Sequence, residues 1–357
     1  MTSAEKHTFS IKRVGGYILT VVITLLFLYL ALRGIDLDKS FSLITHISIL
    51  WLLVYLVVFL LSHYFRAVRW KVMIKPVKKD TSTLNLFGAL MVGYGVNCVI
   101  PRLGEVYRGL FLGKWEKISR TTMIGTVVVE RVIDMASFAL ASLISVYVYS
   151  GDLFKDVEWL KTSLTIGFYA ILIFILGIVI LVRFKHNFTS IILKFTDKIN
   201  PKLSEKTSEF FSTLVDGFSS IKGTGNIVNI IFYTVLIFLF YTLNTYVGFY
   251  MLGMDKIGNV NFSMAWVFMA ISAYGVFIPT PGGTGSYHMI SIFVLSDLYN
   301  FSSEVSAAYA ILSHFIQYVV FIGSTLLLIY IINKKREQEG ATKENFLSVF
   351  KLNAGDK

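Results

Sequence analysis

Six long apolar runs constrain this chain more than any other feature, because each is long enough to cross a bilayer as a helix. Hydrocarbon offers the backbone no hydrogen-bond partners, so a run of this length that enters it is expected to be helical. Of the 357 residues, 55% are hydrophobic and only 15% are charged, too few polar groups to cover a water-soluble fold of this size. The six runs cover residues 15–33, 46–65, 121–149, 163–182, 227–252 and 305–332.

Two further apolar stretches, 84–100 and 262–299, are interrupted by proline and glycine. Such residues break a regular helix, so these stretches do not qualify as simple spans. We therefore predict an all-α fold, a polytopic membrane helix bundle with about six full spans and two re-entrant or broken helical segments. Residues 1–357 are expected to form one integral membrane domain.

The basic residues predict which side of the membrane is cytoplasmic. If each broken stretch returns to the side from which it entered, 27 of the 33 Lys and Arg residues fall on one side. The positive-inside rule then places both termini in the cytoplasm and the chain in the cell membrane. Because the net charge of +11 is spread over short loops, it does not indicate a nucleic-acid surface. The predicted inside segments are 1–15, 66–83, 102–120, 183–225 (an amphipathic cytoplasmic loop) and 334–357 (a polar C-terminal tail).

The two interrupted stretches share a pattern. Tyr-Gly-Val followed by Ile-Pro and then Gly begins at Tyr94 and again at Tyr274, each time after two spans and before one more. The halves, about 14–150 and 160–333, are thus predicted to form an inverted repeat, as in many secondary transporters. The freed backbone groups should line a polar cavity, although ordinary proline kinks are an alternative. The predicted helix breaks are Pro101, Gly104, Pro279, Pro281, Gly282, Gly283 and Gly285.

Three charged residues follow the first break at steps of three. Arg102, Glu105 and Arg108 would share one side of a helix, where Glu105 can pair with both arginines. Such a ladder keeps one net positive charge and spare guanidinium donors, which suit a phosphate. If this segment lies outside the bilayer, these are ordinary interfacial residues.

Three more charges lie within the predicted span 121–149, where Glu130, Arg131 and Asp134 share one face. A charge at the bilayer centre costs about 2.5–3.5 kcal/mol on insertion scales, so we expect each to be paired. Arg131 is predicted to pair with Asp134, which leaves Glu130 to meet Arg102 or Arg108. A purely structural clamp between helices is the alternative.

The remaining candidate residues are uncharged or titrate near neutral pH. His288 and His314 are candidates for a proton-linked step, and a helix-bridging hydrogen bond is the alternative for His314. Two histidines without a third ligand do not make a metal site, and the single Cys98 forms no cysteine-based cluster. No metal or cofactor is predicted. The candidate neutral contacts to a headgroup are Asn97, Thr280 and Thr284.

Taken together, these motifs resemble the lysylphosphatidylglycerol synthase transmembrane-domain family of flippase-like membrane proteins. The stretch Arg66-Ala67-Val68-Arg69-Trp70 is similar to a basic-tryptophan patch of that family. The resemblance covers nearly the whole chain and implies re-entrant helices around a polar cavity through which phospholipids or lipid-linked headgroups move. Two positions depart from the family pattern, since His288 replaces its usual acid and His314 its usual arginine.

The predicted function is therefore translocation of a phospholipid or lipid-linked headgroup across the cytoplasmic membrane. Arg102, Arg108 and Arg131 would hold the phosphate, and the three carboxylates would orient them. The chain is expected to lack the aminoacyl-transferase domain of the full synthases and not to be an enzyme. Its expected partners are membrane lipids with anionic headgroups, with a homodimer and a separate lipid-modifying enzyme left open. The alternatives are a membrane enzyme acting on a polyprenyl-phosphate substrate and an ion-coupled carrier of a soluble solute.

Overall fold

The computed structural model describes residues 11–149 and 224–351, with a few positions between 162 and 177. These residues form helices and turns and contain no strand, so the predicted all-α class is confirmed. Most of the predicted span 163–182 and nearly all of the predicted loop 183–225 lie outside the described residues. The described helices of eight residues or more are α1 (Ile11–Leu32), α2 (Leu37–Thr45), α3 (Ile49–Ile74), α4 (Thr83–Val99), α5 (Gly104–Glu116), α6 (Arg120–Val148), α11 (Thr224–Met251), α12 (Phe262–Phe277), α13 (Ser286–Phe293) and α14 (Ser303–Gln338).

Polar residues mark where several of these helices begin. The Asn261 side chain accepts a hydrogen bond from the Met264 N–H at 2.8 Å and caps α12. Ser48 and Ser302 cap α3 and α14 in the same way. Each cap satisfies one of the backbone N–H groups that a helix leaves free in its first turn. These helices therefore start at defined polar residues.

Four helices, α1, α3, α11 and α14, are long and apolar enough to cross a membrane. Many of their large apolar side chains face outward, as Leu50 (69% exposed) and Leu326 (60% exposed) illustrate. An apolar surface this extensive is unfavourable in water and suits contact with lipid. The predicted run 121–149 forms α6, which is not among these four and carries Glu130, Arg131 and Asp134 near its middle.

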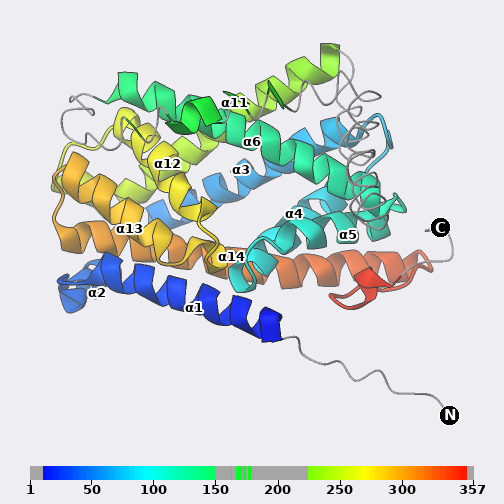
Figure 1. The fold of residues 1–357 in the computed structure, drawn as a ribbon, viewed down its shortest axis with the longest axis horizontal. Coiled ribbons are helices and arrows are strands. Elements are labelled where there is room, and N and C mark those ends of the chain that lie inside the picture. The colour runs from blue at the N-terminus through cyan, green and yellow to red at the C-terminus, as the bar shows by residue number, and fades with distance from the viewer. Residues whose placement is uncertain are drawn as a thin grey trace, which may run out of the picture.

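Two helical hairpins fill the interior between the long helices. α4 and α5 form the first, and α12 and α13 form the second. In Figure 1 they enter from opposite ends of the molecule and their turns meet near its middle. Arg102, in the first turn, donates a hydrogen bond from Nη2 to the carbonyl of Phe277 at the end of α12, at 3.0 Å. The predicted breaks therefore lie at two turns that touch each other.

Glycine allows these turns to close. A Cβ on Gly104 would lie 1.8 Å from the carbonyl oxygen of Gly93, so only glycine permits this approach of α5 to α4. In the second turn, Gly282, Gly283 and Gly285 have φ angles of 54°, 83° and 85°, in the left-handed region that favours glycine. The predicted helix-breaking glycines thus have a steric reason in both hairpins.

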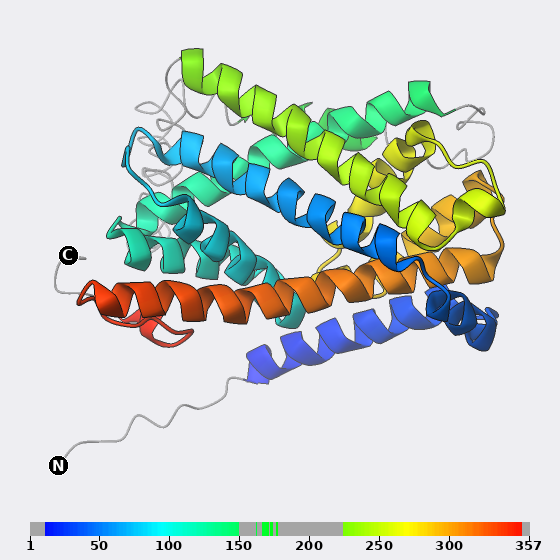
Figure 2. The same ribbon diagram turned by 180° about the vertical axis from the view of Figure 1, so that it is seen from behind.

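Packing partners recur between the two halves of the chain. α3 packs on α4 as α11 packs on α12, and α5 packs on α6 as α13 packs on α14. Each hairpin also packs on the last helix of the other half, α4 on α14 and α12 on α6. At the centre, α3 and α11 pack against each other and run in opposite directions (Figure 2).

Helix α3 is longer than predicted. It continues nine residues beyond position 65 to Ile74, because Trp70, Met73 and Ile74 keep packing into the core with 0% exposure. The sequence places Arg66 and Arg69 in the inside segment 66–83, and the structure shows that the first part of this segment continues α3. Both are buried helix residues, 5% and 0% exposed.

The C-terminal region also folds further than its polar composition predicts. α14 continues to Gln338, and the segment after it packs back onto the helices, where Val349 is fully buried. Arg336 donates to the carbonyls of Trp115, at 3.1 Å, and Thr342. Part of the predicted tail 334–357 therefore packs against the open end of the first hairpin. Residues 352–357 lie outside the described residues.

Candidate functional site

Charged side chains from α3 and α6 meet in the interior. Arg66 and Arg69 lie one turn apart on α3, facing Glu130 and Asp134 one turn apart on α6. Arg66 Nη2 lies 2.6 Å from Glu130 Oε1 and 2.5 Å from Asp134 Oδ2. Arg69 Nη2 contacts Asp134 Oδ1 and lies 3.3 Å from Glu130 Oε1. Two arginines on one helix thus clamp two carboxylates on the next.

Helix α5 adds a third guanidinium to Glu130. Arg108 pairs with Glu130 Oε2, and its guanidinium carbon lies 4.7 Å from the ring centroid of Trp70. Glu130 has no solvent exposure and receives three arginines on two oxygens. Glu130 was predicted to pair with Arg102 or Arg108, and the structure shows that its partner of these two is Arg108.

A more exposed ion pair, between Arg131 on α6 and Glu105 on α5, lies closer to the surface. Arg131 Nη2 lies 3.2 Å from Glu105 Oε1, and Arg131 Nη1 lies 3.9 Å from Asp134 Oδ2. The predicted Arg131–Asp134 pair is therefore present, but Glu105 is the nearer partner. The Arg131 and Glu105 side chains are 34% and 27% exposed, whereas Glu130 is enclosed.

We call these seven side chains the charge cluster. It contains four guanidinium groups and three carboxylates, so one positive charge is left over. Among the described residues, Arg108 Nε and Nη1 and Arg131 Nε are buried without a hydrogen-bond partner. The charge cluster therefore combines excess positive charge with unused donors, which is the chemistry that binds an anion. Its members are Arg66, Arg69, Glu105, Arg108, Glu130, Arg131 and Asp134.

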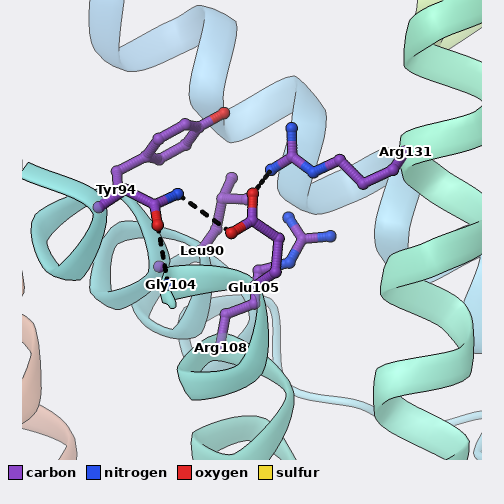
Figure 3. A pocket seen from close by; sticks show the side chains of 8 residues that line it. Leu90, Tyr94, Gly104, Glu105, Arg108 and Arg131 are labelled. Carbon is purple, nitrogen blue, oxygen red and sulfur yellow. Dashed lines mark hydrogen bonds and ion pairs between the residues drawn. The ribbon is translucent and has the colours of Figure 1, made fainter. Parts of the chain in front are cut away.

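A recess reaches the outer side of the charge cluster between α4, α5 and α6. Figure 3 shows the Glu105 carboxylate directed toward the guanidinium of Arg131, with Arg108 behind it and Tyr94 at the rim. The space between these side chains is too small to hold a water molecule. It is narrow, so a bound headgroup would need the surrounding helices to move apart.

Asn97 supports the recess rather than facing it freely. Its amide nitrogen donates to Glu105 Oε2 at 3.3 Å, and its amide oxygen accepts from the Gly104 N–H at 2.8 Å. The second bond satisfies a free N–H at the start of α5. Asn97 thus positions both Glu105 and the hairpin turn.

Arg102 does not join the predicted Arg-Glu-Arg ladder. It precedes the first residue of α5 and has a φ of 63°, so its side chain leaves the helix face that Glu105 and Arg108 occupy. Its hydrogen bond instead goes to the end of α12, where a guanidinium complements the negative end of the helix dipole. Glu105 and Arg108 also find other partners, Arg131 and Glu130, in place of each other.

The candidates in the second half form a separate polar cluster. Thr284 Oγ1 lies 2.7 Å from Tyr318 Oη and 3.3 Å from His314 Nε2, and it donates to the Pro281 carbonyl at 2.6 Å. Thr280 shares a hydrogen bond with Ser286 at 3.1 Å. Thr280 and Thr284 therefore hold the second turn together, and the hydrogen bonds recorded for them do not reach the charge cluster.

Sequence reasoning missed Arg66 and Arg69 as members of the site. They provide four of the contacts to Glu130 and Asp134, and they also donate to Tyr241 and Thr234 on α11, at 3.2 Å and 3.1 Å. The available signal was their spacing of three residues on a helix whose apolar pattern continues past position 65.

Membrane-length helices that enclose paired charges define this chain as a polytopic membrane protein with a polar interior. A profile of the family described as the lysylphosphatidylglycerol synthase TM region matches residues 17–324, and the chain belongs to this family, as its motifs predicted. A UPF0104 membrane protein of Methanocaldococcus jannaschii is 26% identical over 310 residues, which cover 84% of this chain and 90% of that protein. A UPF0104 membrane protein of Methanothermobacter thermautotrophicus is 25% identical over 267 residues, 70% of this chain and 76% of that protein. No solved structure matches.

Proposed function

We propose that this protein translocates a phospholipid or lipid-linked headgroup across the cell membrane. The observation that carries the proposal is the one positive charge left over in the charge cluster, next to a recess where Arg131 and Glu105 are partly exposed. Unbalanced positive charge is costly at membrane depth unless an anion offsets it. A phosphate group is such an anion, while the lipid tails remain in the bilayer.

Exchange of partners at Arg131 is the central step of this proposal. Phosphate and carboxylate oxygens accept the same paired guanidinium hydrogen bonds. An arriving phosphate therefore replaces Glu105 on Arg131 and gains the unused donors of Arg108. The enclosed contacts of Arg66 and Arg69 with Glu130 and Asp134 keep the remaining charges in place during the exchange.

Alternating exposure follows from the architecture if the halves are an inverted repeat. The recurring packing partners and the antiparallel α3–α11 pair support that relation. In such proteins, one half rocks against the other around a site at discontinuous helices. Here the rocking motion separates the two turns, breaks the Arg102–Phe277 hydrogen bond and widens the recess.

The proposed orientation places the open end of the first hairpin in the cytoplasm. Few basic residues lie in the described segments at the opposite end, namely Arg33, Lys39 and Lys256. The positive-inside rule assigns the richer end to the cytoplasm, together with both termini. The basic residues at the open end of the first hairpin include Lys75, Lys78, Lys79, Lys117, Arg120, Lys335, Lys343 and Lys351.

A proteoliposome assay with fluorescent phosphatidylglycerol tests the function. The Arg131→Ala variant is expected to move the lipid at least about tenfold more slowly, because a hydrogen bond to a charged group contributes about 1.5–3 kcal/mol. The control is Lys256→Ala, which removes an exposed charge far from the site and should leave the rate unchanged. Equal rates for Arg131→Ala and the unsubstituted protein would contradict the proposal.

A further inference from the structure

Two histidines from different helices lie against each other beside the second turn. The rings of His288 on α13 and His314 on α14 have centroids 4.6 Å apart, and the residues are 6% and 7% exposed. Two cationic rings this close in a buried site repel each other strongly. The pair therefore accommodates at most one proton.

Both rings hold the turn that joins α12 to α13. The Gly285 N–H donates to His288 Nδ1 at 3.3 Å, and His314 Nε2 lies 3.3 Å from Thr284 Oγ1. Gly285 is the residue before α13, so the His288 ring occupies the place of the reciprocal acceptor in a capping box. The start of α13 thus depends on a titratable side chain.

The hydrogen bond from Gly285 defines the protonation state of His288. A ring nitrogen accepts a hydrogen bond only when it carries no proton, so Nδ1 is unprotonated and the neutral ring carries its proton on Nε2. A proton added at Nδ1 changes this nitrogen from an acceptor into a donor that faces another N–H. The cap on α13 therefore exists only while His288 is neutral.

Among the described residues, the side chains recorded against the pair are uncharged. Within residues 11–149 and 224–351, no salt bridge is recorded for either ring, and the surrounding side chains are hydroxyls and one thiol. α1 contributes the backbone of Thr24 and the side chain of Phe27, which pack against Gly285. The titratable and polar neighbours are Tyr287 on α13, Ser313 and Tyr318 on α14, Tyr55 on α3 beside Tyr287, and Cys98 on α4 beside Tyr318.

The pair occupies a position that corresponds to the Arg131–Glu105 pair of the charge cluster. His314 lies eleven residues after the first residue of α14, as Arg131 lies eleven residues after the first residue of α6. Each faces a residue in the first turn of the adjacent hairpin helix, His288 and Glu105 respectively. One half of the chain thus places a fixed ion pair where the other half places a proton-binding pair.

We infer that His288 and His314 form a one-proton binding site, and that its occupation releases the second turn and couples movement of the hairpins to protons. The released turn packs on α4, next to the Arg102–Phe277 contact between the two turns. Protonation removes the cap on α13, loosens this contact and favours opening of the recess. The link to lipid movement rests on the proposed function, whereas the proton-controlled turn does not.

Cys98 provides a native reporter of this opening. It is the single cysteine, it is buried near the end of α4, and it neighbours Tyr318. The experiment measures maleimide labelling of Cys98 in vesicles at about pH 4 and about pH 8, a range that extends below the solution titration of histidine because both rings are buried. Each rate is divided by that of unfolded protein at the same pH, which removes the effect of thiol ionisation.

The labelling rate of the unsubstituted protein is expected to rise about fivefold at the lower pH. Loss of one hydrogen bond shifts the equilibrium between the closed and open turn by about this factor. His288→Gln keeps an acceptor oxygen for the Gly285 N–H and removes the ring whose protonation breaks the cap, so most of the pH dependence of its labelling should be lost. His46→Gln, which makes the same change at an exposed histidine at the end of α2, is the matched control and should behave like the unsubstituted protein. Equal pH dependence in His288→Gln and the unsubstituted protein, or none in the latter, would overturn the inference.

A lipid-transport measurement on the same vesicles separates this inference from the proposed function. If Cys98 labelling responds to pH through His288 while no lipid moves, the proton site stands and the proposed function fails. If lipid moves with the same pH dependence in His288→Gln and in the unsubstituted protein, the function stands and the proton coupling fails.

Discussion

Replacement of Glu130 by glutamine is expected to destabilise the folded protein by about 3–5 kcal/mol, the typical cost of removing one partner from a buried ion pair. Glu130 has no solvent exposure and offsets the charge of Arg66, Arg69 and Arg108. Without its charge, Asp134 alone would offset Arg66 and Arg69, and Arg108 would lose the carboxylate with which it pairs. The midpoint of thermal unfolding in detergent should fall sharply, and the yield of folded protein from membranes should fall with it.

The matched control for Glu130→Gln is Glu105→Gln, which makes the same chemical change in a residue that is partly exposed and pairs with Arg131. Solvent screening makes such pairs contribute about 0–1 kcal/mol, so the midpoint should change little. A similar loss of stability in both variants, or none in Glu130→Gln, would show that the charge cluster is not enclosed as described.

Gly104→Ala is expected to destabilise the protein by about 3 kcal/mol, the upper end for overpacking a tight interior. The added methyl group would lie 1.8 Å from the Gly93 carbonyl oxygen and 2.7 Å from Asn97 Oδ1. The Gly93 carbonyl belongs to the backbone of α4, so it cannot yield without separating α5 from α4. Unfolding in a denaturant series should therefore begin at a lower concentration.

Gly323→Ala serves as the control for Gly104→Ala, because nothing lies within 4 Å of a Cβ at this position on α14. Alanine is favoured over glycine within a helix by about 1 kcal/mol, so this variant should be as stable as the unsubstituted protein or slightly more so. If Gly104→Ala behaves like Gly323→Ala, the hairpin is not closed as tightly as the structure indicates.

The fold class could be predicted because apolar runs and helix-breaking residues act locally. The two turns follow from Pro101 and from the Pro-Gly tract after Pro279, whose backbone preferences do not depend on distant contacts. The charged residues of α6 could be found because a charge within an apolar run is costly. These features needed no knowledge of packing.

The membership of the charge cluster could not be predicted, because pairing depends on which helices pack together. Arg66 and Arg69 follow an apolar run and resemble a topology signal until the helix is seen to continue to Ile74. Arg102 has helical spacing from Glu105, but its left-handed φ removes it from the helix. Sequence spacing describes neighbours on one helix, whereas most pairs in this site connect different helices.

The central claim is that both hairpin turns lie at membrane depth and enclose a polar passage. It is tested by spin labels on Val99→Cys and Val276→Cys in a Cys98→Ser background, since these side chains lie near the two turns and are 68% and 56% exposed. Both labels should collide with dissolved oxygen and not with a water-soluble nickel chelate, whereas a label on Leu347→Cys, 80% exposed, should collide with the chelate. Ready contact of the chelate with both turn labels would place the turns in bulk water and contradict the account.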